Sequence, residues 1–116
     1  MFEALEISFE VIRELRQVLT TIRRRSDRLA RQIEAAASSV PLNLGEGRRR
    51  FGRDRLHHYR VAAGSADEVR CALQVAVTWG YVRENDVEEC LRHLDSVLAI
   101  LWTLTQGRKE LVSHNR

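Results

Sequence analysis

An arginine-rich run near the middle of the chain carries the most distinctive chemistry of the sequence. Five of the eight residues from Arg48 to Arg55 are arginines, and Phe51 and Gly52 lie among them. A guanidinium group can contact a phosphate, and an exposed phenylalanine can stack on an unpaired base. The run therefore predicts a turn that binds anions or nucleic acid; a solvated turn whose arginines pair with acidic helices is the alternative. The predicted contact residues are Arg48, Arg49, Arg50, Phe51, Arg53 and Arg55, together with Arg23, Arg24 and Arg25 of an earlier basic run.

Histidines and carboxylates are the next candidates, as possible metal ligands. Asp54, His57 and His58 are spaced by about one helical turn, and His93 and Asp95 would have to complete the ligand set. Two adjacent histidines diverge by about 100° around a helix, however, and the chain has no HExxH pair. The sequence predicts neither a metal site nor a bound cofactor.

The segment 45–47 (Gly-Glu-Gly) has the glycines of a phosphate-binding loop but not its lysine. A phosphate loop needs a following Lys and Ser or Thr, and here Gly47 is followed by arginines. Glu46 could act as a base, but a carboxylate near a proline more often caps backbone N–H groups or pairs with a nearby arginine. We therefore expect no catalytic residues and no enzymatic activity.

Positive charge is concentrated in one part of the chain. The formal net charge is +3, yet residues 13–60 contain 13 arginines and only five acidic residues. Such concentration favours anion binding more than the total charge does. Arginine accounts for 18 of the 19 basic residues, with Lys109 the exception, and this bias can also reflect genomic base composition.

Composition and length indicate one all-helical domain. The 116 residues are 44% hydrophobic and 30% charged, with one proline and six glycines. No stretch is long and apolar enough to predict a membrane span, and the N-terminal residues do not read as a signal peptide, so we expect a cytoplasmic protein. Cys71 and Cys90 each interrupt no apolar helical pattern, and both are expected to be reduced and buried.

Apolar residues recur at intervals of three and four in four segments, which predicts helices over about 3–22, 27–47, 54–79 and 86–106, followed by a frayed tail. Ser26 and Asn85 are the expected N-caps, and Pro41 should kink the second helix. The expected core faces are Leu5, Phe9, Ile12 and Leu19 in the first segment; Leu29, Ile33, Ala36, Val40 and Leu44 in the second; Tyr59, Ala62, Ala66, Val69, Leu73 and Ala76 in the third; and Val87, Leu91, Leu94, Leu98, Leu101 and Leu104 in the fourth.

The third segment also carries a second apolar stripe. Cys71, Val75 and Trp79 follow one another at intervals of four, away from the main seam. Apolar groups on more than one face of a helix indicate contacts beyond its own bundle, and here they predict self-association.

The run Ser39–Gly47, SVPLNLGEG, resembles the SIPxNIAEG signature of the bacterial "four helix bundle protein" family. Further matches lie before the signature, around residues 63–68, and at the Trp79–Tyr81 run, so the resemblance covers about residues 27–106. The family includes proteins encoded by intervening sequences in 23S ribosomal RNA genes and the accessory variability determinants of diversity-generating retroelements. Two features depart from it: Gly45 replaces the usual alanine, and the first helix lacks the commoner N-terminal pattern.

The resemblance implies an up-down-up-down antiparallel bundle, often assembled as a ring-like homopentamer with a basic surface that engages nucleic acid or a reverse transcriptase. The leading hypothesis is therefore an oligomeric, non-enzymatic protein that binds structured RNA or another nucleic acid. The rival is a scaffold whose basic turn docks an acidic protein such as a reverse transcriptase. The signature positions are expected to be structural; they are Pro41, Asn43, Glu46, Gly47 and Gly64, the last to allow close backbone approach.

Overall fold

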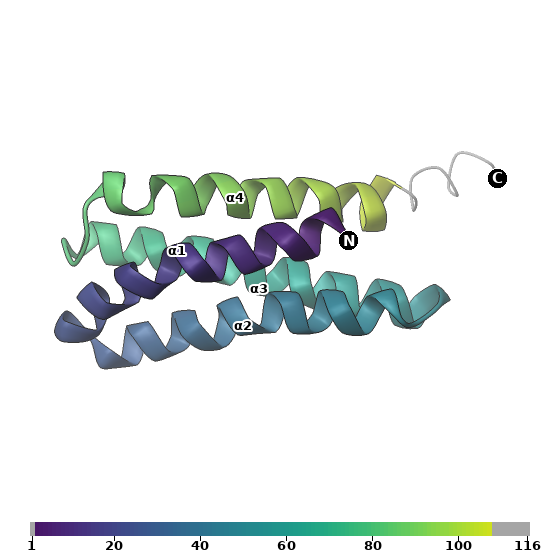
Figure 1. The fold of residues 1–116 in the computed structure, drawn as a ribbon, viewed down its shortest axis with the longest axis horizontal. Coiled ribbons are helices and arrows are strands. Elements are labelled where there is room, and N and C mark those ends of the chain that lie inside the picture. The colour runs from purple at the N-terminus through teal and green to yellow at the C-terminus, as the bar shows by residue number, and fades with distance from the viewer. Residues whose placement is uncertain (1, 108–116) are drawn as a thin grey trace.

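The computed structural model describes residues 2–107, which form four α-helices and a terminal π-helical segment (Figure 1). Successive helices run in opposite directions, so the fold is an up-down-up-down four-helix bundle, as predicted. The bundle measures 52 × 25 × 23 Å. Its elements are α1 (Glu3–Arg25), α2 (Asp27–Arg48), α3 (Gly52–Thr78), α4 (Glu84–Trp102) and the π-helical segment η1 (Thr103–Gly107).

The two ends of the bundle carry different turns. The α2–α3 turn shares its end with the start of α1, because the ring of Phe2 lies 5.7 Å from that of Tyr59 near the start of α3. The α1–α2 and α3–α4 turns share the other end, where the Arg25 guanidinium lies 5.2 Å from the centre of the Tyr81 ring. These ends are called the α2–α3 end and the α3–α4 end below.

The core-facing side of α1 differs from the predicted one. Phe9, expected at its centre, is 40% exposed, and Ile12 is only partly buried. The buried stripe is rotated toward residues that the prediction set beside this face, and it includes a serine whose hydroxyl donates to the Leu5 carbonyl at 2.7 Å. The buried residues of α1 are Ala4, Leu5, Ser8, Val11, Leu15, Val18, Leu19 and Ile22.

Helices α2 and α3 face each other through small residues. The predicted α3 seam is buried along its whole length, and on α2 only Leu29 of the predicted face is not fully buried. Alanine side chains let two helix axes approach closely, which increases the packing of backbone against backbone. The buried alanines are Ala30, Ala36 and Ala37 of α2 and Ala62, Ala66, Ala72 and Ala76 of α3.

The second stripe of α3 is exposed. Val75 is 39% exposed and Trp79 is 69% exposed. Cys71 is exposed as well, so the prediction that both cysteines are buried was wrong for this one, because it lies on the outward face of α3. Cys90 is buried, and burial, with a smaller contribution from the charge of Glu14, raises the pKa of its thiol to about 12.

Local capping explains where most helices begin and end. The Ser26 hydroxyl accepts from the Leu29 N–H at 3.1 Å, which confirms Ser26 as the N-cap of α2. Asn85 is not the cap of α4: the helix begins one residue earlier, and the Asp86 carboxylate accepts from the Arg83 N–H at 2.9 Å. Gly80 ends α3 with a φ of +79°, a conformation that side chains with a Cβ rarely adopt.

Pro41 lies inside α2 and does not divide it. The helix continues from Asp27 to Arg48, although a proline cannot donate to the Ala37 carbonyl. The proline ring is buried, so its packing contributes to the core in place of the missing hydrogen bond. None of the helices described within residues 2–107 has the length and apolar character of a membrane span.

Candidate nucleic-acid interface

The α2–α3 turn is short because two local features allow the chain to reverse. Gly52 has a φ of +57°, in the left-handed region that glycine adopts without steric penalty. One turn before the end of α2, Gly47 lies against α3: a Cβ at this position would stand 2.7 Å from Cε1 of Tyr59 and 3.0 Å from Cβ of His58. The absence of a side chain at Gly47 thus brings the end of α2 against the start of α3.

Two of the five arginines in the run hold the turn together. The Arg55 guanidinium donates to the carbonyls of Gly47 at 3.3 Å and Arg48 at 3.2 Å, and it lies 5.7 Å from the centre of the Phe51 ring. The last carbonyls of a helix lack intrahelical donors, so this side chain caps α2. Arg55 therefore has a structural role in addition to the predicted phosphate contact.

Arg50 is the second of these arginines. Its guanidinium donates to Asp54 at 3.0 Å and to Glu46 at 3.3 Å, which joins the end of α2 to the first turn of α3. The hydrogen bond to Glu46, followed by the negative charges of Asp54 and Glu46, raises the pKa of Arg50. Pairing with two carboxylates offsets its positive charge, so Arg50 adds little to anion binding. The pairing of Glu46 with a nearby arginine agrees with the sequence-based interpretation.

The other three arginines of the run face solvent. Arg48, Arg49 and Arg53 are exposed, and none forms an ion pair with the residues that the structure describes. Phe51 is 83% exposed and lies between them in the chain. Beside Phe51, a cavity of about 380 Å³ extends toward Tyr59 and Leu104. The α2–α3 end thus presents three unpaired guanidinium groups and an exposed aromatic ring.

The earlier arginines lie at the opposite end of the bundle. Arg23 pairs with Asp27 at 3.4 Å, and Arg25 lies over the Tyr81 ring, whereas Arg24 is exposed. The bundle is 52 Å long, so one molecule does not combine the two arginine sets in a single surface. The sequence analysis had grouped them, and this grouping does not hold within one chain.

The signature segment forms a polar network between α2 and α3. The Asn43 amide donates to the Ser39 carbonyl at 2.9 Å and to the Ser39 hydroxyl at 3.1 Å, and its Oδ1 lies 3.1 Å from Nδ1 of His58. The Ser65 hydroxyl donates to that of Ser39 at 2.8 Å. Asn43 therefore links the turn after Pro41 to α3.

Gly64 does not have the predicted role. A Cβ built at Gly64 would meet nothing within 4 Å, and the residue is exposed on α3. The same is true of space around Gly45. Close approach of α2 and α3 therefore depends on Gly47 and the buried alanines.

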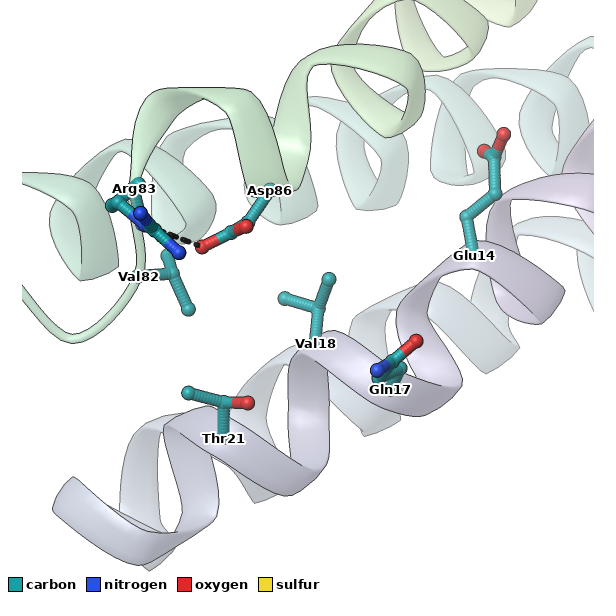
Figure 2. A pocket seen from close by; sticks show the side chains of 7 residues that line it. All are labelled: Glu14, Gln17, Val18, Thr21, Val82, Arg83 and Asp86. Atoms are coloured by element: carbon teal, nitrogen blue, oxygen red, sulfur yellow. Dashed lines mark hydrogen bonds and ion pairs between the residues drawn. The ribbon is translucent and has the colours of Figure 1, made fainter.

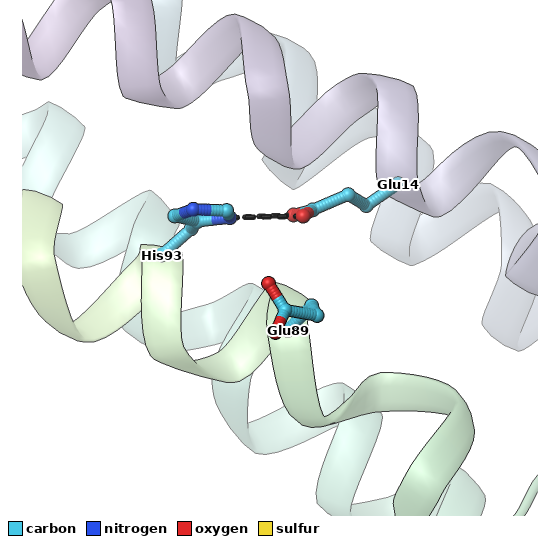
Figure 3. A group of neighbouring side chains, drawn as sticks. All are labelled: Glu14, Glu89 and His93. Carbon is cyan, nitrogen blue, oxygen red and sulfur yellow. Dashed lines mark hydrogen bonds and ion pairs between the residues drawn. The ribbon is translucent and has the colours of Figure 1, made fainter.

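Asp54, His57 and His58 do not form a ligand set. Asp54 pairs with Arg50, His58 contacts Asn43, and His57 is exposed. Instead, the structure brings together Glu14 of α1 with Glu89 and His93 of α4, whose ligand atoms all lie within 4.8 Å of one another (Figure 3).

Sequence reasoning missed the group formed by Glu14, Glu89 and His93. Glu14 and His93 are 79 residues apart, although the spacing of four between Glu89 and His93 places those two on one helix face. Only the register between α1 and α4 reveals the third member, and that register is not visible in one sequence.

A separate cavity of about 400 Å³ opens between α1 and the start of α4 (Figure 2). Arg83 and Asp86 line one side, Val18 and Thr21 line the other, and Glu14 stands at one edge. This cavity lies toward the α3–α4 end and is remote from the α2–α3 turn.

The comparisons with known proteins place this fold in a family. The sequence profile of the 23S rRNA-intervening sequence protein family matches residues 2–103. The chain belongs to this family. A solved structure from Bacteroides thetaiotaomicron, described as a protein of unknown function from the S23 ribosomal protein family, has a TM-score of 0.77 and 16% sequence identity. The similarity covers 87% of this chain and 96% of that one, and it supports the four-helix fold. No curated protein matches the chain.

Proposed function

We propose that this member of the 23S rRNA-intervening sequence protein family is a non-enzymatic protein that binds structured RNA, through the α2–α3 end. The observation that carries the proposal is the set of exposed guanidinium groups of Arg48, Arg49 and Arg53, which have no carboxylate partner in the described part of the chain. Unpaired guanidinium groups attract phosphates without first breaking an ion pair. The family name adds support, since it links relatives of this chain to ribosomal RNA genes.

Phe51 supplies the second part of the interaction. A side chain that is 83% exposed beside a cavity can stack on an unpaired base of a loop or bulge. Aromatic stacking contributes about 1–3 kcal/mol per base, whereas the arginines supply attraction that does not depend on sequence. The proposed ligand is therefore RNA that combines a duplex with unpaired bases, bound in the cytoplasm.

We also propose that the protein assembles into a ring-like homo-oligomer, with a homopentamer as the expected state. The exposed stripe of Val75 and Trp79 on α3 supports self-association because a monomer gains nothing from exposing a tryptophan there. Several copies would place several α2–α3 ends on one assembly and increase its avidity for a long RNA. Sedimentation of the wild type and of Val75→Asp tests this part: a wild type that stays monomeric at micromolar concentration contradicts it.

The binding test is a fluorescence-anisotropy titration against a structured RNA, a duplex DNA and an acidic polypeptide at two salt concentrations. The variant replaces Arg48, Arg49 and Arg53 with alanine. The matched control removes the same charge from arginines that already have carboxylate partners, namely Arg13, Arg31 and Arg92. The first variant should bind RNA at least tenfold more weakly and lower the slope of log K against log salt by about 2–3, whereas the control should bind much as the wild type does.

Two outcomes would contradict the proposal. Equal losses in the variant and the control would mean that only total charge matters. Equal binding to RNA and to the acidic polypeptide, abolished by salt in both cases, would direct the search toward a protein partner of the basic turn.

A further inference from the structure

From the geometry of Glu14, Glu89 and His93 we infer a binding site for a divalent transition-metal ion of the Zn²⁺ type between α1 and α4. This inference is independent of the proposed RNA binding, and it departs from the sequence analysis, which expected no metal site. The three side chains come from two helices, and their ligand atoms already lie within 4.8 Å of one another (Figure 3).

The arrangement of His93 and Glu14 suits shared coordination. Nδ1 of His93 lies 2.9 Å from both carboxylate oxygens of Glu14. In a tetrahedral zinc site with bonds of about 2.0–2.1 Å, two ligand atoms are separated by roughly 3.3 Å. A small outward movement of the two side chains would therefore admit an ion between the nitrogen and one oxygen. Both side chains are largely buried, with 28% of His93 and 20% of Glu14 exposed, so packing limits their motion.

Glu89 supplies the third ligand from the same face of α4. One of its oxygens, Oε2, accepts from Arg92, and the other has no hydrogen-bond partner among the described residues. A spacing of four residues puts Glu89 and His93 one helical turn apart, so their side chains approach the same point. Figure 3 shows the Glu89 carboxylate close to the contact between Glu14 and His93.

The donor set selects the kind of ion. One imidazole nitrogen with two carboxylates suits Zn²⁺ and related transition metals, whereas Mg²⁺ and Ca²⁺ prefer oxygen ligands alone. Three protein ligands leave a fourth position for water, and the two carboxylates balance the charge of a divalent ion. The bound ion would join the first helix to the last, so it would stabilise the folded state in proportion to its occupancy.

The test uses the full chain, purified without a polyhistidine tag and treated with a chelator. Calorimetric titration with Zn²⁺, Mn²⁺ and Mg²⁺ measures affinity, and thermal unfolding with and without each ion measures stabilisation. We expect one Zn²⁺ per chain, a rise in Tm of several degrees, weaker binding of Mn²⁺ and none of Mg²⁺. Glu89→Gln and His93→Ala should each weaken Zn²⁺ binding at least tenfold.

Glu89→Gln keeps the variant interpretable if His93→Ala unfolds, because Glu89 is exposed and its loss leaves the helix contacts intact. The control is His57→Ala with His58→Ala, which removes histidines outside the site and should leave Zn²⁺ affinity unchanged. Zinc binding that survives both ligand variants, or that disappears in the control, would overturn the assignment. So would a wild type whose Tm does not respond to Zn²⁺.

Discussion

Gly47→Ala provides the most direct test of how α2 and α3 are held together. The new methyl carbon would lie 2.7 Å from Cε1 and 2.8 Å from Cδ1 of Tyr59, and 3.0 Å from Cβ of His58. Carbon atoms pack at about 3.5–4.0 Å, so a ring that is only 7% exposed would have to move by nearly an ångström. The neighbouring His58 Cβ is fixed to the backbone of α3 and cannot turn away.

The expected magnitude follows from two opposing terms. Overpacking of a filled site costs about 1–3 kcal/mol. Alanine gains up to about 1 kcal/mol over glycine in helix formation. The free energy of unfolding should therefore fall by about 1–2 kcal/mol, which corresponds to a decrease in Tm of roughly 5–15 °C for a domain of this size.

Gly45→Ala and Gly64→Ala are the matched controls, because a Cβ at either position meets nothing within 4 Å. Each should raise the free energy of unfolding by about 0.5–1 kcal/mol. The assay is urea and thermal unfolding followed by circular dichroism. A Gly47→Ala protein as stable as the wild type would refute the close approach. A smaller penalty for Gly47→Ala in a Tyr59→Leu background would identify the ring as the obstacle.

Three further predictions concern single side chains. The free energy of unfolding should fall between about pH 9 and 12, because the Cys90 thiol ionises near 12 when folded but near 9.0 when unfolded, and Cys90→Ala should flatten this part of the pH profile. In the native protein a thiol reagent should modify Cys71 rapidly and Cys90 only on unfolding, which mass spectrometry will show. Arg55→Ala should destabilise the protein by about 1–3 kcal/mol through loss of the α2 cap, whereas Arg53→Ala should change stability by less than about 0.5 kcal/mol in the same urea titration.

The sequence predicted the fold well because each helix carries its own periodic signal. The α3 seam, from Tyr59 to Ala76, alternates at three and four residues and is buried throughout. The α1 face was less certain, since apolar residues cover a wide arc, and packing against α4 decided that Phe9 faces outward. Periodicity thus located the helices, while the choice among neighbouring apolar residues depended on the partner helix.

The candidate sites were harder to predict because they depend on which segments meet. Consecutive turns of an up-down bundle lie at opposite ends, so the topology alone separates Arg23–Arg25 from Arg48–Arg55. The engagement of Arg50 and Arg55 could not be predicted from composition, since it depends on the φ of Gly52 and on the packing at Gly47. Helix register was the missing information in each case.

The first and last described helices meet at the α2–α3 end, where Phe2 and Leu104 line one cavity. A short linker could join the end of η1 to Phe2, and the chain could be opened at the exposed Gly80. Such a circular permutant would keep the same helix packing but make α1 and α4 consecutive in sequence. The contact between Glu14 and His93, now 79 residues apart, would become local. Folding rates rise as contacts become more local, so the permutant should fold faster than the natural chain order at similar stability.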